Sequence, residues 1–319
     1  MSDRRRILSI DGGGIKGVFP IAFLARVESE LQLKAIGRYF DLIAGTSVGG
    51  IIALGLGLGL TARELQEFFI SNGSEIFPSE FPGLTTLRLI VGRDRYRAER
   101  FRQALDEAFG TRKLGESKTR LLIPSFDATR GDIHIYKTAH AERLSTDYKI
   151  DAVDVALSTA AAPTYLPVFD SVSGVTFVDG ALYANNPVAL AVVEAVSLLK
   201  WTPDEIDVLS IGCTEQADCF APRGHRFLFW ARRALDSAML GQSRAALGMA
   251  MHLTGRDNGK DNVVRVNRVV ERGRFSLNGT KHIRQLQGLG VGEARHQVSA
   301  LRDRFFACEA SQFVPFYST

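Results

Sequence analysis

The sequence predicts an α/β fold with a mainly parallel central sheet that is covered by helices on both faces. Two observations support this prediction. Short apolar runs typical of buried strands alternate along the chain with longer segments of helical spacing. Glycine-rich turns join the first two of these strands directly to the helices that follow them. Strands that alternate with helices in this way are typical of βαβ units, in which the strands run parallel.

The first two units share the order of strand, glycine turn and helix. A strand is predicted at 6–10, a turn at 11–14 and a helix over 18–33. The same order returns over 40–58, and a capping-box pattern at 61–64 predicts the start of another helix. Further strands are predicted at 121–126, 133–138, 175–178, 206–211 and 263–266, and further helices at 98–109, 152–159, 187–199, 226–253 and 293–306.

The composition is that of an ordinary globular protein. The chain has 319 residues, of which 45% are hydrophobic and 23% charged, and we expect one continuous domain over 1–319. The longest apolar stretch, 51–60, is about half of the roughly 20 residues that a membrane-spanning helix requires. The basic N-terminus lacks the apolar core of a signal peptide, which predicts a cytoplasmic location. Cys213, Cys219 and Cys308 are too few and too irregularly spaced for a disulfide framework or a zinc site.

A Gly-x-Ser-x-Gly pattern lies between the second strand and its helix. Gly45 and Gly49 flank Ser47, after the apolar run 40–44 and before the helical run 51–54. This is the sequence form of a nucleophile elbow, a strained strand-to-helix turn that lifts a serine above a sheet. Ser47 would then lie at a helix N-terminus, where the dipole and free N–H groups stabilise negative charge. The alternative interpretation is a turn with no role beyond joining the two elements.

Three successive glycines, Gly12, Gly13 and Gly14, follow the first strand. With a fourth glycine three residues later, they match the dinucleotide-binding pattern and suggest an oxidoreductase. That function needs an acidic residue at the end of the second strand, whereas the available acids, Glu28 and Glu30, fall inside the predicted helix. In a hydrolase, the N–H groups of successive glycines would instead converge on one oxyanion.

A serine nucleophile needs a proton acceptor, which is usually a histidine held by a carboxylate. None of the six histidines lies in a recognisable catalytic loop. By contrast, Asp179 ends an apolar strand and precedes Gly180, which opens a turn. Functional loops of an α/β sheet follow the carboxyl ends of its strands. An Asp-Gly pair is also a common structural turn, so the residue types alone leave both interpretations open.

The three motifs together resemble the patatin-like phospholipase family. The glycine turn, the Ser47 elbow and Asp179-Gly180-Ala181 occur in the family's order with similar spacing, and the resemblance covers roughly residues 6–215. It implies a patatin-like three-layer α/β/α sandwich and a phospholipase A activity on membrane glycerophospholipids. It also implies that Ser47 attacks the ester carbonyl, that Asp179 takes the serine proton directly, and that the backbone of Gly12, Gly13 and Gly14 forms the oxyanion hole. The resemblance implies neither a metal nor any other catalytic cofactor.

Within that family the chain is most similar to the CapV-type effectors of bacterial CBASS anti-phage systems, which a cyclic dinucleotide activates. This resemblance implies a cyclic dinucleotide ligand and peripheral action on phospholipid at the inner face of the membrane. The arginine-rich, helical part over 223–319 suits phosphate recognition, although no pocket can be assigned to it. A constitutive lipid acyl hydrolase or thioesterase without nucleotide control is the alternative.

Two further expectations concern partners and mobility. The net charge of +4 is too slight to indicate DNA or RNA, and a homo-oligomer is compatible with the sequence. Residues 71–97 scatter apolar side chains among prolines and glycines without clean periodicity. We expect this segment to be either a flap that meets lipid or an irregular loop with ordinary packing.

Overall fold

A sheet with the strand order β5-β6-β3-β2-β1-β7-β9 lies at the centre of the molecule, and β4 pairs with β3 outside this path. The computed structural model describes residues 4–76, 93–162, 166–216, 227–271, 274–275 and 280–319. A separate two-stranded pair joins β8 to β10. The strands are β1 (Arg5–Ile10), β2 (Leu42–Gly45), β3 (Arg120–Asp127), β4 (Asp132–Lys137), β5 (Phe169–Asp170), β6 (Thr176–Asp179), β7 (Ile206–Ile211), β8 (Glu215–Gln216), β9 (Val263–Val266) and β10 (Val269–Val270).

The sheet has a parallel part and an antiparallel part. Strands β3, β2, β1, β7 and β9 run parallel, whereas β4, β6 and β5 are paired antiparallel. Only four residues, 128–131, separate β3 from β4, and so short a connection cannot make the crossover that parallel strands need. The prediction of a mainly parallel sheet is confirmed. The antiparallel strands β4, β5 and β6 were not predicted as such from the sequence.

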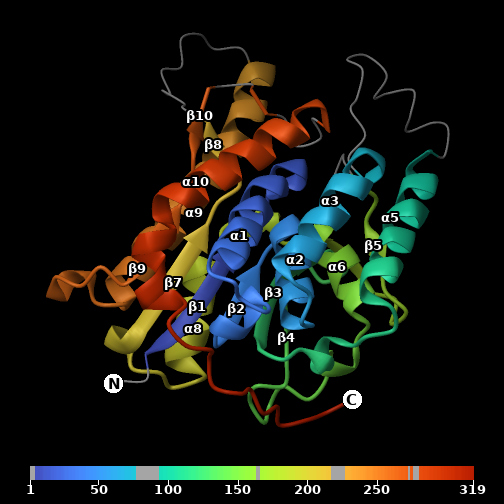
Figure 1. Ribbon diagram of the computed structural model, residues 1–319. Helices are drawn as coiled ribbons and strands as arrows, with labels where there is room; N and C mark the ends of the chain where they lie inside the picture. Colours follow the sequence, from blue (N-terminus) through green and yellow to red (C-terminus); the bar gives the residue numbers. More distant parts are fainter. Residues whose placement is uncertain (1–3, 77–92, 163–165, 217–226, 272–273, 276–279) are drawn as a thin grey trace.

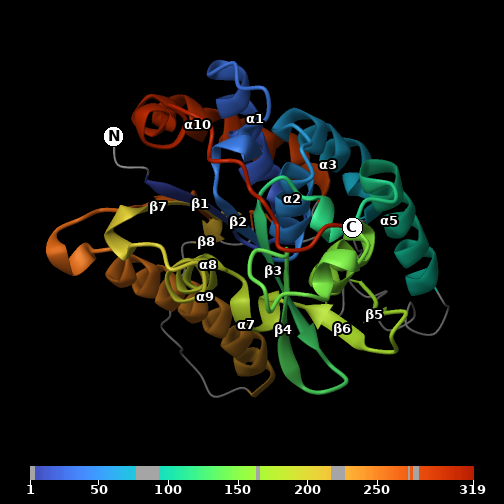
Figure 2. The same ribbon diagram turned by 90° about the horizontal axis from the view of Figure 1, so that it is seen from below.

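Helices cover both faces of the sheet, which makes three layers (Figure 1). Seen from below, α1, α2, α3 and α10 lie on one side of the strands and α8 and α9 on the other (Figure 2). The first layer comprises α1 (Val18–Glu30), α2 (Val48–Gly57), α3 (Ala62–Ile76), α5 (Arg93–Phe109), α6 (Ala152–Ala160) and α10 (Ile283–Phe305); the second comprises α8 (Val188–Ser197) and α9 (Phe227–Leu253), next to the short α7 (Ala181–Ala184).

The two hydrophobic cores follow from the alternation of side chains along each strand. In β1, Leu8 and Ile10 belong to the larger core under the first helical layer, whereas Ile7 belongs to the core under α8 and α9. All three side chains are fully buried. Strands buried on both faces carry continuous apolar runs, which is why the runs at 6–10 and 206–211 were recognisable in the sequence.

Helix α10 begins at Ile283, so the predicted start at 293 is wrong by ten residues. The prediction began too late because glycines interrupt the helical pattern of the first turns. Gly290 lies on the face that packs against α1, where an added Cβ would come within 2.4 Å of the Phe19 carbonyl oxygen. A glycine here lets the two helix backbones approach closely, and the same residue lowers the helix propensity of the segment. Helix α3, in contrast, has the predicted capping box, with the Glu64 N–H donating to Thr61 Oγ1 at 3.1 Å.

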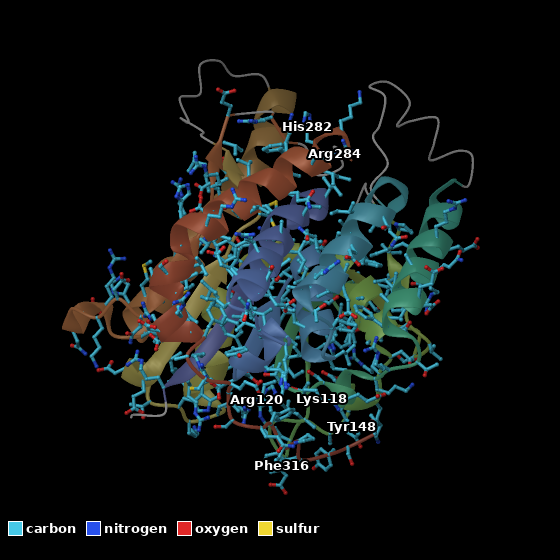
Figure 3. All side chains as sticks on the ribbon, viewed as in Figure 1. Lys118, Arg120, Tyr148, His282, Arg284 and Phe316 are labelled. Atoms are coloured by element: carbon cyan, nitrogen blue, oxygen red, sulfur yellow. The ribbon has the colours of Figure 1, made fainter. Side chains whose placement is uncertain are left out.

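The chain ends across the amino ends of the parallel strands, at the base of the view in Figure 3, where Arg120 and Tyr148 are labelled. The Tyr317 ring stacks on Tyr148 with centroids 5.6 Å apart, and the Arg120 guanidinium lies 5.0 Å from the centre of the Phe313 ring. These contacts occupy the amino end of the sheet. Among the described helices, none is both long and apolar enough to cross a bilayer.

Candidate active site

The turn between β2 and α2 has the geometry of a nucleophile elbow. Ser47 has φ 57° and ψ −127°, a backbone conformation that side-chain-bearing residues rarely adopt and that costs of order 1–3 kcal/mol. Glycines make the turn sterically feasible, because a Cβ on Gly45 would lie 2.1 Å from the Gly49 carbonyl oxygen. A Cβ on Gly49 would likewise lie 2.4 Å from the Ile10 carbonyl oxygen. Ser47 is the residue just before α2, so its side chain lies at the helix N-terminus.

Strand register brings Ser47 and Asp179 together. Strand β2 pairs with the first residues of β3 through Leu122, whereas β6 pairs with β3 from Ser125 onward. Because β4 occupies the other edge of β3, β2 and β6 share one edge and run toward each other. Their carboxyl ends therefore meet, and Ser47, three residues beyond Ala44, falls level with Asp179 opposite Ser125. An antiparallel β6 is thus what places a distant aspartate beside the elbow.

The Ser47 hydroxyl donates a hydrogen bond to Asp179 Oδ2 at 2.7 Å. Both residues are buried, with exposed fractions of 8% for Ser47 and 3% for Asp179. Burial raises the pKa of Asp179 to about 6, and the hydrogen bonds from Ser47 and the Ala181 N–H oppose this rise. A carboxylate with a raised pKa is a stronger base than an ordinary aspartate, as proton abstraction from a hydroxyl requires.

Thr159 supports the elbow through a contact that no sequence pattern indicated. Its Oγ1 accepts a hydrogen bond from the Ser47 N–H at 3.0 Å and donates to the Pro124 carbonyl at 2.6 Å. The Asp179 carboxylate is held in turn by the N–H of Ala181, which donates to Oδ1 at 2.8 Å. A Cβ on Gly180 would lie 2.3 Å from the Pro124 carbonyl oxygen, which explains the Asp-Gly pair.

The glycine turn after β1 packs against the elbow, but its three residues are not equivalent. A Cβ on Gly12 would come within 3.2 Å of the Ser47 Cβ. The Gly12 N–H, however, donates to the Asn185 carbonyl at 2.9 Å, so in this conformation it is not free for a substrate. Gly14 has φ 55° and needs to be glycine for that reason. This leaves the N–H groups of Gly13 and Gly14 as the candidate oxyanion donors from the predicted trio.

The dinucleotide-binding alternative finds no support in this geometry. Glu28 lies inside α1 and accepts hydrogen bonds from the N–H groups of Ile36 and Ala62. Its carboxylate therefore stabilises the backbone of two neighbouring segments. Strand β2, where the ribose-binding acid of such a site would follow, instead runs into Ser47. The second strand therefore leads to the candidate nucleophile Ser47 in place of an acid.

The remaining candidates have structural contacts. No hydrogen bond of the five described histidines reaches Ser47 or Asp179; the buried His140, for example, bonds to Glu194 at 2.9 Å. Cys213 is buried and donates to the Asp11 carbonyl at 3.2 Å. Within the described part of the chain, no cluster of three or more His, Cys, Asp or Glu side chains is arranged to hold a metal.

Two predicted features fall wholly or partly outside the described residues. The flap expected over 71–97 includes 77–92, and the C-terminal arginines include Arg223 and Arg226. Arg265, another of these arginines, lies within the described residues and is largely buried. It lies within the apolar strand β9 and forms an ion pair with Asp11, the residue before the glycine trio. An arginine among valines was the sequence signal that could have drawn attention to it.

Comparison with known proteins identifies the family. Residues 8–192 match the Patatin-like phospholipase family. A protein named cGAMP-activated phospholipase from Escherichia coli is 35% identical over 69% of this chain and 65% of its own length. Proteins with the same name from Vibrio cholerae and Pseudomonas aeruginosa are each 32% identical, over 70% and 79% of this chain and 68% and 76% of their own lengths.

The family match begins in β1 and ends in α8, so it contains the glycine turn, Ser47 and Asp179. Its boundaries enclose the meeting point of β2 and β6 and leave out β7, β9 and the last two long helices. The family match and the named relatives support the family that the motifs indicated in the sequence. The chain belongs to the patatin-like phospholipase family, an enzyme family of the carboxylic ester hydrolases.

Proposed function

We propose that this protein is a serine acyl hydrolase of the phospholipase A type, with Ser47 as nucleophile and Asp179 as general base. The hydrogen bond of 2.7 Å between Ser47 Oγ and Asp179 Oδ2, in a buried site, is the observation that carries the proposal. The strained elbow and the adjacent glycine turn support it, because they supply the two other parts that acyl transfer needs.

The proposed reaction proceeds in two halves. Asp179 takes the proton of the Ser47 hydroxyl as Oγ attacks the ester carbonyl carbon, and the resulting oxyanion is stabilised by N–H groups of Gly13, Gly14 and the start of α2. Collapse of this tetrahedral species breaks the ester bond, and the leaving alcohol, a lysophospholipid, receives the proton from Asp179. Water then attacks the acyl-enzyme with Asp179 again as base, which releases the fatty acid and restores Ser47.

We further propose that a cyclic dinucleotide activates the enzyme in anti-phage defence. Support comes from the names of three bacterial relatives, each called a cGAMP-activated phospholipase. Activation also explains how a cell could carry a hydrolase that attacks its own membrane lipids. In this proposal the residues 1–319 act as one patatin-like unit in the cytoplasm, which meets the membrane peripherally at its inner face.

The chemistry is tested by labelling with a fluorophosphonate and by release of fatty acid from phosphatidylglycerol and phosphatidylethanolamine vesicles. Wild-type protein should be labelled and should release fatty acid, and Ser47→Ala should do neither. Ser299→Ala is a matched control, because Ser299 lies on the exposed side of α10 and has no part in the proposed reaction. Labelling or hydrolysis that survives Ser47→Ala would contradict the assignment of the nucleophile.

The regulation is tested by the same vesicle assay with a panel of cyclic dinucleotides, including cGAMP. At least one member should raise the rate of fatty acid release, and a linear dinucleotide of the same bases should not. Equal rates in every condition would favour a constitutive lipid acyl hydrolase, and they would leave the Ser47–Asp179 chemistry standing.

A further inference from the structure

A buried ion pair links strand β9 to the residue that opens the glycine turn. Arg265 Nη1 donates to Asp11 Oδ1 at 2.9 Å, and Nη2 donates to Asp11 Oδ2 at 2.5 Å. The Asp11 side chain is 6% exposed and the Arg265 side chain 15%. The two parallel N–H donors match the two carboxylate oxygens, which is the geometry that fixes orientation as well as distance.

The strand register explains how Arg265 reaches Asp11. Arg265 pairs with Ser210 on β7, and Ser210 pairs with Ser9 on β1, so the three residues stand side by side across the sheet. Asp11 follows Ser9 by two residues and therefore faces the same side of the sheet. The arginine crosses β7, donates to Ser210 Oγ at 2.7 Å, and ends at Asp11.

Asp11 is tied down at its backbone as well. Its N–H donates to the Ile211 carbonyl at 3.0 Å, and its own carbonyl accepts the Cys213 thiol at 3.2 Å. The next N–H, that of Gly12, donates to Asn185. The peptide that leads into Gly13 and Gly14 is thus held on both sides, and the Arg265 ion pair adds a charged side-chain anchor to these backbone contacts.

We propose that Arg265 is a positioning residue, whose guanidinium holds Asp11 so that the Gly13 and Gly14 N–H groups stay aimed at the oxyanion formed on Ser47. This inference rests on the proposed function. It assigns a role in that reaction to a residue from β9, which lies beyond the segment that matches the family. Misplacement of such donors by about 1 Å lowers rate by roughly 100-fold, and it affects the transition state more than the bound substrate.

The test compares Arg265→Met with Arg304→Met in the hydrolysis of p-nitrophenyl butyrate, with melting temperatures measured in parallel. Arg304 is a matched control because it forms an ion pair with the buried Asp207 at the opposite end of β7, at 2.7 Å. Arg265→Met should lower kcat by about 10- to 100-fold with KM nearly unchanged, and Arg265→Lys should recover part of the loss. Arg304→Met should lower the melting temperature and leave kcat within about twofold.

A second variant keeps the test decisive if Arg265→Met does not fold. Asp11→Asn preserves the shape of the side chain and removes its charge, and it should lower kcat by about 10-fold at unchanged KM. Wild-type kcat in either Arg265→Met or Asp11→Asn, with Ser47→Ala inactive, overturns the positioning role and leaves the proposed function intact. Equal loss of kcat in Arg265→Met and Arg304→Met also overturns it. Hydrolysis that survives Ser47→Ala overturns the proposed function and this inference together.

Discussion

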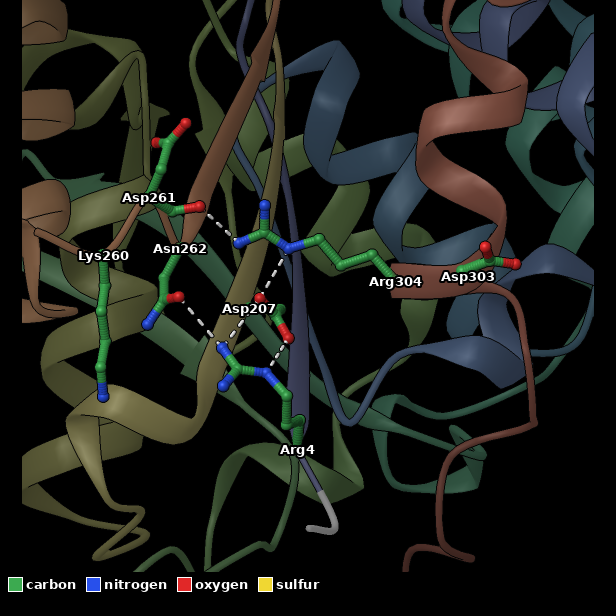
Figure 4. Close-up of a pocket in the computed structure, with 7 residues that line it drawn as sticks. All are labelled: Arg4, Asp207, Lys260, Asp261, Asn262, Asp303 and Arg304. Atoms are coloured by element: carbon green, nitrogen blue, oxygen red, sulfur yellow. Dashed lines mark hydrogen bonds and ion pairs between the residues drawn. The ribbon is translucent and has the colours of Figure 1, made fainter. Parts of the chain in front are cut away.

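Two buried aspartates, Asp207 at the amino end of the parallel strands and Asp179 at their carboxyl end, have opposite surroundings. At the amino end, Asp207 accepts hydrogen bonds from Arg304 at 2.7 Å and from Arg4 at 3.0 Å (Figure 4). At the carboxyl end, Asp179 accepts hydrogen bonds, among the described residues, only from the Ser47 hydroxyl and the Ala181 N–H. The first carboxylate is neutralised by cations, whereas the second is buried beside neutral donors alone.

The difference distinguishes a carboxylate whose charge is neutralised within the fold from a carboxylate whose basicity is raised by burial. The amino-end cavity, of about 480 Å³, is lined by three basic and three acidic side chains and by Asn262, so its charges balance. Arg4 also donates to Asn262 Oδ1, and Arg304 also donates to the Asp261 carbonyl, so both guanidinium groups have further hydrogen-bond acceptors besides Asp207. At the carboxyl end, burial without a cation raises the pKa of Asp179 to about 6, next to a strained serine. Perturbed groups of this kind cluster at functional sites.

The largest expected effect comes from exchanging each aspartate for asparagine. Asp179→Asn should lower kcat/KM for ester hydrolysis by about 1,000-fold, because asparagine cannot accept the serine proton. Asp207→Asn should keep activity within about twofold and lower the melting temperature, since two arginines lose their partner. If Asp179→Asn retained wild-type activity, the two ends would not differ in function and the base would have to be sought elsewhere.

The next effect concerns backbone strain in the glycine turn. Gly14→Ala should lower kcat by about 100-fold, because its φ of 55° disfavours a side chain and any shift moves a proposed oxyanion donor. Gly110→Ala is the matched control, with φ 60° and no atom within 4 Å of an added Cβ. Both variants should lose a similar amount of stability, measured by urea unfolding. Only the first should lose activity, and equal activity in the two would remove Gly14 from the site.

The pH dependence of hydrolysis is expected to be smaller but specific. The proposed base, Asp179, can accept a proton only when it is ionised, and burial raises its pKa to about 6. The value of kcat/KM should therefore reach a plateau above pH 6 and fall about 10-fold for each pH unit below it. An ordinary aspartate would keep the plateau down to about pH 4. A profile measured with p-nitrophenyl butyrate that stays flat down to pH 4 would contradict the raised pKa.

The smallest predicted effect is a gain of stability when the buried charge of Asp179 is removed. Because the pKa of Asp179 is higher in the folded than in the unfolded chain, folding favours its protonated form. Its contribution to stability is complete below about pH 4 and is lost as pH rises through about 6. Asp179→Asn should thus raise the melting temperature by roughly 2–4 °C at pH 8. At pH 4 calorimetry should find no difference, and a gain that persists there would point to a cause other than charge.

The α/β alternation, the elbow and the order of the three motifs could all be predicted from the amino-acid sequence. Buried parallel strands must be apolar along their whole length, and a strand that enters a helix through one strained residue needs glycines around it. Ser47, Asp179 and the glycine trio were recognisable for these local reasons. The start of α10 was missed because glycines weaken its helical pattern, and one of them, Gly290, is required for close contact with α1.

Only the tertiary structure decided which of these residues meet. The antiparallel pairing of β6 on the same edge of β3 as β2 brings Asp179 to Ser47, and no local pattern encodes that edge. Three other contacts likewise join distant segments of the chain. The Gly12 N–H donates to Asn185, the Ser47 N–H donates to Thr159, and Arg265 crosses β7 to bind Asp11. A raised pKa depends on burial, and burial is a property of the assembled layers and not of the residue type.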